Sequence, residues 1–137
     1  MSDAVPTALR SLVRARAKNR CEYCLLHEED SDLAHEPDHV IASKHRGRTR
    51  EENLAWSCFE CNRHKGSDVG SFDVESTSFV RLFNPRMDEW SNHFRLEGPY
   101  IVPLTPEARV TEFLLQLNDP DRVDTRGFLM AAGRYPR

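Results

Sequence analysis

The sequence lacks any apolar run of the roughly 18 residues that a membrane-spanning helix requires. Its N-terminal segment has no apolar core of the kind found in secretion signals. It also contains no internal repeat and no low-complexity tract. These absences argue against a membrane partner and against secretion, and we expect a cytoplasmic protein.

An excess of basic residues is absent as well. The chain has 19 Lys and Arg against 22 Asp and Glu, a net charge of -3, which taken alone speaks against nucleic acid as a partner. The basic residues are nevertheless clustered, within Arg10 to Arg20 and again within Lys44 to Arg50. Such clusters are either solvated surface faces or local stripes that follow phosphates.

Length and composition fit a small globular unit. The chain has 137 residues, of which 39% are hydrophobic and 30% charged, so enough apolar surface is available to offset the entropy of ordering. We expect a single domain, or a small domain with an appendage.

Cysteine is scarce but patterned, in the two pairs Cys21-x-x-Cys24 and Cys58-x-x-Cys61. Disulfides are not expected in a reducing cytosol. Each short knuckle presents two sulfurs on one side, so two knuckles complete a tetrahedron that suits Zn²⁺ best. A rubredoxin-like iron site and four unrelated buried thiols are the alternatives. Four thiolates leave no open coordination position, so the zinc would be structural.

The N-terminal half predicts the order helix, strand, loop, strand, helix. The expected elements are a helix from Pro6 or Thr7 to about Lys18, a strand within 35–42, a basic loop over 44–52, a strand over Leu54 to Ser57, and a helix that begins near Cys58 or Glu60 and runs past Lys65.

The C-terminal half predicts a hairpin and two helices. Residues 66–78 are rich in Gly and Ser and are expected to form a surface connection. The expected elements beyond it are a hairpin of Trp90 to Leu96 with Tyr100 to Leu104, a helix from Pro106 to about Leu117, and a helix from Asp119-Pro120 to about Ala132. The aromatic residues of this part are expected in the core rather than as a stacking surface for bases.

Asp38 and His39 form a polar pair beside an apolar strand segment. A hard carboxylate oxygen suits Mg²⁺ or Mn²⁺, and a neutral imidazole suits proton abstraction from water near pH 7. Alone, the pair is more simply a turn cap and a half-buried histidine. Adjacent side chains on a strand point to opposite faces, so a common site would require the strand to bend.

Asp38-His39-Val40-Ile41, Gly47, Asn53-Leu54 and Cys58-x-x-Cys61-Asn62-x-x-Lys65-Gly66 together resemble the HNH endonucleases in order and spacing. The likeness extends from Arg20 to about Asp68. It implies an α+β fold with a ββα-metal core stabilised by a four-cysteine zinc site. The patterns described above add an N-terminal helix and a C-terminal hairpin plus helices. We therefore expect a nuclease domain in residues 1–69 and a C-terminal extension in 70–137 that packs on it.

The resemblance also implies roles for individual residues. His39 would be the general base that activates water for attack on a DNA phosphodiester. Asp38 and Asn62 would be the protein ligands of one catalytic Mg²⁺ or Mn²⁺ ion. Asn53 would brace the loop between the strands through hydrogen bonds to backbone and so fix the orientation of the His39 side chain.

Two positions depart from the family pattern. His64 lies two residues past the family's metal position, so on a helix it points about 200° away from Asn62. Arg46-Gly47 stands where many members have two glycines, which adds a charge near the expected DNA path. The residues expected to contact DNA are Lys44, Arg46, Arg48, Arg63, His64 and Lys65.

Two other classes of protein remain open. One is a catalytically inactive, zinc-stabilised DNA-binding module of the same fold, and the other is a zinc-held protein interaction domain. His35 is more simply a polar residue at a strand end than a member of the site. No heptad pattern indicates an oligomeric state.

Overall fold

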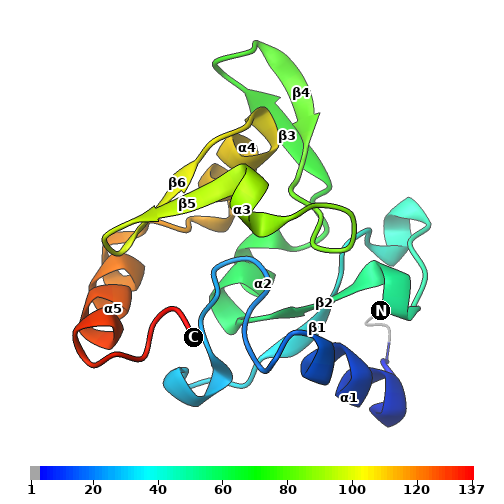
Figure 1. The fold of residues 1–137 in the computed structure, drawn as a ribbon. Coiled ribbons are helices and arrows are strands. Elements are labelled where there is room, and N and C mark those ends of the chain that lie inside the picture. The colour runs from blue at the N-terminus through cyan, green and yellow to red at the C-terminus, as the bar shows by residue number, and fades with distance from the viewer. Residues whose placement is uncertain (1–3) are drawn as a thin grey trace.

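A computed structural model describes residues 4–137 of the chain. Within this range the helices and strands are mixed, and every sheet is a two-stranded antiparallel hairpin or pair (Figure 1). The elements are α1 (Thr7–Arg16), β1 (Glu36–His39), β2 (Leu54–Ser57), α2 (Phe59–Lys65), β3 (Gly70–Asp73), β4 (Ser78–Arg81), α3 (Trp90–His93), β5 (Phe94–Glu97), β6 (Tyr100–Pro103), α4 (Pro106–Leu115) and α5 (Pro120–Ala131). The predicted α+β class is confirmed. None of these helices has the length and apolar character to cross a membrane.

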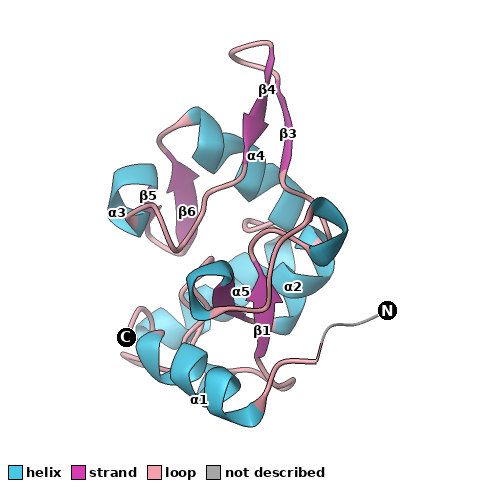
Figure 2. Cartoon of the chain, turned by 90° about the vertical axis from the view of Figure 1, so that its right-hand side faces the viewer, coloured by secondary structure: helices cyan, strands magenta, loops and turns pink. Residues whose placement is uncertain are grey.

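The unit β1–β2–α2 lies at the centre of the molecule, as Figures 1 and 2 show. β1 pairs with β2 so that Asp38 lies opposite Ala55 and His39 opposite Leu54. β2 is buried along its whole length, and the chain passes from it directly into α2. Cys58 caps this helix, because its sulfur accepts a hydrogen bond from the backbone N–H of Cys61. The predicted order of strand, loop, strand and helix is therefore present.

The loop between β1 and β2 is held by one asparagine. Asn53 Oδ1 accepts a hydrogen bond from the backbone N–H of Ile41 (3.0 Å). Its Nδ2 donates to the carbonyls of Ile41 and Arg48, both at 2.9 Å. These are bonds of the kind that the family resemblance implied for Asn53, and they tie the two ends of the loop together.

The same loop requires glycine at position 47 for reasons of space. A Cβ atom there would lie 1.7 Å from the carbonyl oxygen of Ile41 and 2.9 Å from Asn53 Nδ2. The preceding residue, Arg46, has a left-handed backbone (φ 72°), where a glycine would be unstrained. The loop thus tolerates a side chain at position 46 but not at 47.

Helix α1 packs on the outside of β2. Val13 and Ala17 form a small apolar cluster with Leu54 and Trp56. The helix ends at Arg16 rather than at the predicted Lys18, because Lys18 and the residue after it adopt left-handed backbone angles that turn the chain toward the first cysteine pair.

The sequence predicts a surface connection over residues 66–78, and the structure forms regular strands there. This segment contains β3 and the turn into β4, a hairpin that projects from the molecule in Figure 1. Asp73, at the end of β3, accepts a hydrogen bond from the backbone of Ser76 in the turn and forms an ion pair with Arg109 of α4 at 2.9 Å. The Asp73–Arg109 ion pair joins residues far apart in the sequence and stabilises the hairpin. The Gly and Ser content of the segment, taken alone, indicated a loop.

The prediction for the start of the next hairpin is wrong. Residues 90–93 form the helical turn α3, and the strand β5 begins at Phe94. Phe94 and Ile101 are buried, as predicted for the core, whereas Tyr100 is exposed. The two buried residues belong to an apolar cluster that also contains all four cysteines and the α4 residue Leu115. The C-terminal elements and the cysteine pairs therefore share one core.

We predict that Gly47→Ala destabilises the protein by about 1–3 kcal/mol or prevents folding, because the new methyl group meets backbone atoms that cannot move aside without breaking the Asn53 bonds. The measurement is the free energy of unfolding in urea. Gly127→Ala is the matched control: a Cβ at Gly127, within α5, approaches nothing closer than 4.0 Å, so this change should leave stability equal or slightly raised. Equal stability of the two variants would contradict the close approach at position 47.

Candidate metal centre and active-site cleft

The four cysteines converge on one point. Their sulfurs all lie within 4.8 Å of one another, all four residues are buried, and the Sγ atoms of Cys24 and Cys58 are 3.7 Å apart. A tetrahedral zinc ion with Zn–S bonds of about 2.3 Å has S···S edges of about 3.8 Å, close to the separation of Cys24 and Cys58, so the cluster is near the size that this ion requires. In the described part of the chain this is the only group of three or more His, Cys, Asp and Glu side chains placed to share a metal.

The backbone also favours thiolates at this centre. The N–H groups of Tyr23 and Cys24 donate to Cys21 Sγ at 3.4 and 3.5 Å, and Cys61 N–H donates to Cys58 Sγ at 3.4 Å. Hydrogen bonds from the neighbouring sulfurs lower the pKa of the Cys24 thiol, whereas hydrogen bonds from neighbouring sulfurs raise the pKa of Cys58 and burial raises that of Cys61. Zinc binds the thiolate form, which the backbone N–H donors favour at Cys21 and Cys58.

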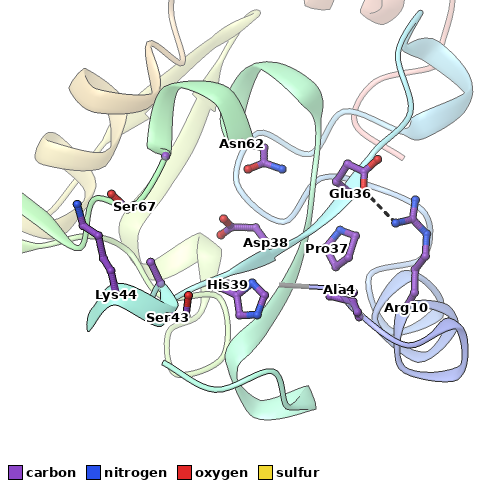
Figure 3. A pocket seen from close by; sticks show the side chains of 13 residues that line it. Ala4, Arg10, Glu36, Pro37, Asp38, His39, Ser43, Lys44, Asn62 and Ser67 are labelled. Carbon is purple, nitrogen blue, oxygen red and sulfur yellow. Dashed lines mark hydrogen bonds and ion pairs between the residues drawn. The ribbon is translucent and has the colours of Figure 1, made fainter. Parts of the chain in front are cut away.

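A cleft of about 830 Å³ lies beside this centre, and Figure 3 shows the residues that line it. Asp38 and His39, at the end of β1, and Asn62, on α2, all contribute to its wall. The two adjacent residues of β1 therefore share one cleft instead of serving two separate faces. Lys44 and Arg10 lie toward opposite ends of it.

Asp38 is buried, with 5% of its surface exposed, and its carboxylate is held from two sides. The phenol of Tyr23 donates to Oδ2 at 2.8 Å, and Lys65 Nζ lies 3.2 Å from the same oxygen and 3.3 Å from Oδ1. Burial raises the pKa of Asp38, while the Lys65 charge and the Tyr23 hydrogen bond act in the opposite direction. Because Tyr23 stands between Cys21 and Cys24, it connects a cysteine knuckle directly to the cleft.

His39 is oriented by a residue that the sequence patterns did not single out. Its Nε2 lies 2.9 Å from Thr49 Oγ1, in the loop that Asn53 braces. The other ring nitrogen, Nδ1, takes no part in this hydrogen bond. Thr49 has no motif of its own, and only the fold of the loop brings it to the imidazole.

Lys65 was predicted to contact DNA, but its side chain is 1% exposed. In addition to its ion pair with Asp38, its ammonium donates to the backbone carbonyl of His39 at 2.9 Å. It cannot reach a phosphate on the surface from this position. The prediction is therefore wrong for Lys65. Its side chain instead stabilises β1 from the interior, through its contacts with Asp38 and the His39 carbonyl.

The other DNA-contact candidates remain on the outside. Lys44, Arg46, Arg48 and Arg63 are exposed and His64 is half-buried, and within residues 4–137 none of these side chains has a hydrogen-bond or ion-pair partner. Two basic side chains of the first cluster, by contrast, form ion pairs, Arg10 with Glu36 and Arg14 with Glu28. Among the DNA-contact candidates, the unpaired positive charge thus lies in the 44–48 loop and at Arg63.

His35 lies outside the cleft. It is buried, its Nε2 is 2.9 Å from the carbonyl oxygen of Leu26, and its ring packs against Trp56. Its contacts are those of a structural residue.

Residues 21–68 match the family model described as HNH endonuclease. This segment is about a third of the chain and contains both cysteine pairs and the three cleft residues Asp38, His39 and Asn62. No curated protein and no solved structure gave a significant match.

The segment 21–68 is thus an HNH domain in sequence, and its β1–β2–α2 order and its cysteine cluster agree with that fold. An HNH domain indicates a nuclease or nucleic-acid-binding function. The chain is similar to this family through that segment, while residues beyond 68 lie outside the matched region.

We predict that Cys58→Ser abolishes zinc retention and unfolds the domain, because binding free energy at a structural zinc site is folding free energy. The measurement is zinc content by mass spectrometry together with near-UV circular dichroism. Wild-type protein stripped of metal by a chelator provides the comparison and should show the same loss of tertiary signal. A folded, cooperatively melting Cys58→Ser protein without metal would refute this dependence.

We predict that Lys65→Met costs about 3–5 kcal/mol, because it leaves the buried Asp38 carboxylate without its cation. The double variant Lys65→Met/Asp38→Asn should be more stable than Lys65→Met alone, since the unpaired charge is gone. Lys44→Met, at an exposed lysine, should have little effect. A double-mutant cycle from urea unfolding checks this, and purely additive losses would show that the two side chains do not interact.

Proposed function

We propose that the chain is an HNH-type endonuclease that hydrolyses DNA phosphodiester bonds with one catalytic divalent ion. One observation carries this proposal: an imidazole, a carboxylate and a carboxamide from β1 and α2 line the same cleft, inside the segment that matches the HNH family. A module that only binds DNA has no use for these three groups together.

His39 is the general base of the proposed reaction. With Nε2 engaged by Thr49, Nδ1 accepts a proton from the water that attacks the phosphorus. A neutral imidazole performs this step near pH 7. Asn53 contributes by fixing the loop that carries Thr49, and it contacts backbone rather than substrate.

Asp38 and Asn62 are the proposed ligands of Mg²⁺ or Mn²⁺. Both present oxygen donors, which these hard ions prefer, and two protein ligands leave room for the waters that Mg²⁺ retains. When bound, the ion stabilises the negative charge that develops on the phosphate and the leaving oxygen. Lys65 and Tyr23 hold the Asp38 carboxylate in place and favour its ionised form.

DNA is the proposed partner, and the unpaired basic side chains around the cleft support it. Lys44 lines the cleft, and Arg46 and Arg48 continue the positive charge along the adjoining loop. Such a local stripe attracts the phosphate backbone although the whole chain carries a net charge of -3. Arg63 and His64 extend the same proposed contact surface from α2. Reduced zinc-binding thiols and this substrate fit a cytoplasmic protein.

The test is nicking of supercoiled plasmid by zinc-loaded protein in Mg²⁺ or Mn²⁺. We predict that His39→Ala lowers the rate by roughly 10²- to 10⁴-fold while the melting temperature stays near that of the wild type, because the base is lost and the scaffold is not. His45→Ala is the matched control, since His45 is exposed in the same loop and does not line the cleft. It should nick like the wild type.

Equal nicking by wild type and His39→Ala would contradict the assignment of the base. Retained DNA binding, without nicking by the wild type in either metal, would favour the alternative: a zinc-stabilised DNA-binding module of the same fold. Fluorescence anisotropy with a labelled duplex separates binding from cleavage.

A further inference from the structure

The C-terminal helix α5 reaches the cysteine centre with one charged side chain. Arg122, in the first turn of α5, donates from Nη2 to Cys61 Sγ at 3.0 Å, and the same nitrogen lies 3.7 Å from Cys58 Sγ. Its other terminal nitrogen donates to the carbonyls of Leu115 and Gln116 at 2.8 and 3.2 Å. The guanidinium is therefore fixed from behind by the end of α4 and directed at the sulfurs.

This contact places a positive charge beside a metal site that carries excess negative charge. A zinc ion with four thiolates carries a net charge of about -2, and the four cysteines are buried, so the excess charge is poorly solvated. Within residues 4–137, the other hydrogen-bond donors to these sulfurs are backbone N–H groups and a neighbouring thiol. Among the residues that the structure describes, Arg122 is the one charged side chain that donates to them, and hydrogen bonds from charged donors are about twice as strong as neutral ones.

We propose that Arg122 is an outer-sphere partner of the zinc centre, which neutralises part of the thiolate charge and so retains the metal. The C-terminal part of the chain thereby acts on the HNH domain through its metal and not only through apolar packing. Arg122 takes no direct part in the proposed nuclease reaction, because it does not line the cleft that holds His39.

A second arginine on the same helix separates this role from ordinary packing. Arg126 lies one turn further along α5 and is buried, whereas Arg122 is half-buried. Arg126 donates to the carbonyl of Pro99 at 2.7 Å and to Asn118 Oδ1 at 3.1 Å, and within residues 4–137 it donates no hydrogen bond to a sulfur. Loss of either guanidinium removes part-buried hydrogen bonds, but only loss of Arg122 removes a bond to the cysteine sulfurs.

The test compares Arg122→Met with Arg126→Met in the full, zinc-loaded chain. Both keep an apolar stem and lose the charge. We predict that zinc passes to the chromogenic chelator 4-(2-pyridylazo)resorcinol about 10- to 100-fold faster from Arg122→Met than from the wild type, the range typical for loss of a group that bonds to a metal ligand. Zinc release from Arg126→Met should equal that of the wild type, even if its melting temperature falls.

Cobalt substitution gives a spectroscopic band whose energy reports on the sulfur ligands and not on side-chain packing elsewhere. In the Co²⁺ form, the sulfur-to-cobalt charge-transfer band of Arg122→Met should shift to lower energy, because a hydrogen bond that stabilised the sulfur lone pairs is lost. The band of Arg126→Met should stay in place. Should Arg122→Met not fold, Arg122→Gln replaces it in both measurements. Zinc release and band position indistinguishable between the position-122 and position-126 variants would overturn the proposal.

Discussion

The convergence of four sulfurs from two distant knuckles is the constraint on which the rest of the structure depends. Cys21 and Cys24 follow α1, whereas Cys58 and Cys61 begin α2, and the cluster locks these segments against each other. The cleft is built on the same residues. Tyr23, inside the first knuckle, holds Asp38, and Asn62 directly follows the last cysteine. A change in the knuckles therefore displaces both proposed ligands of the catalytic ion, because each is attached to a knuckle directly or through one hydrogen bond.

Two kinds of metal chemistry are kept apart by the choice of donor atoms. The thiolates are soft, buried and four in number, which suits a zinc ion with no free position. The cleft offers hard oxygen donors and open space, which suits an exchangeable Mg²⁺ or Mn²⁺. Lys65 binds neither metal. Its buried ammonium pairs with the Asp38 carboxylate, and this pairing allows the carboxylate to remain charged in a poorly solvated position beside the thiolate site. In the proposed enzyme one metal thus maintains shape and the other takes part in the reaction.

Local patterns predicted the elements whose chemistry is contained in short stretches. The two Cys-x-x-Cys pairs and the start of α2 near Cys58 depend on close neighbours in the sequence. The bonds of Asn53 to its loop also span about a dozen residues or fewer, but it was the family resemblance that implied them. The features that were missed depend on partners far along the chain. The β3–β4 hairpin is anchored by Arg109 of α4, Lys65 is buried because Asp38 lies opposite it, and Arg122 meets Cys61 only when the start of α5 lies beside the cysteine centre. Spacing in the sequence carries no signal for such pairs.

The measurement that tests the central claim most directly is anomalous diffraction from a zinc-loaded crystal soaked in Mn²⁺. Data collected at the zinc and manganese absorption edges distinguish the two ions. The account predicts zinc alone among the four Sγ atoms and one manganese peak in the cleft, within bonding distance of Asp38 and Asn62. Manganese absent from the cleft at saturating concentration, or bound away from these two residues, would contradict the division between a structural and a catalytic metal.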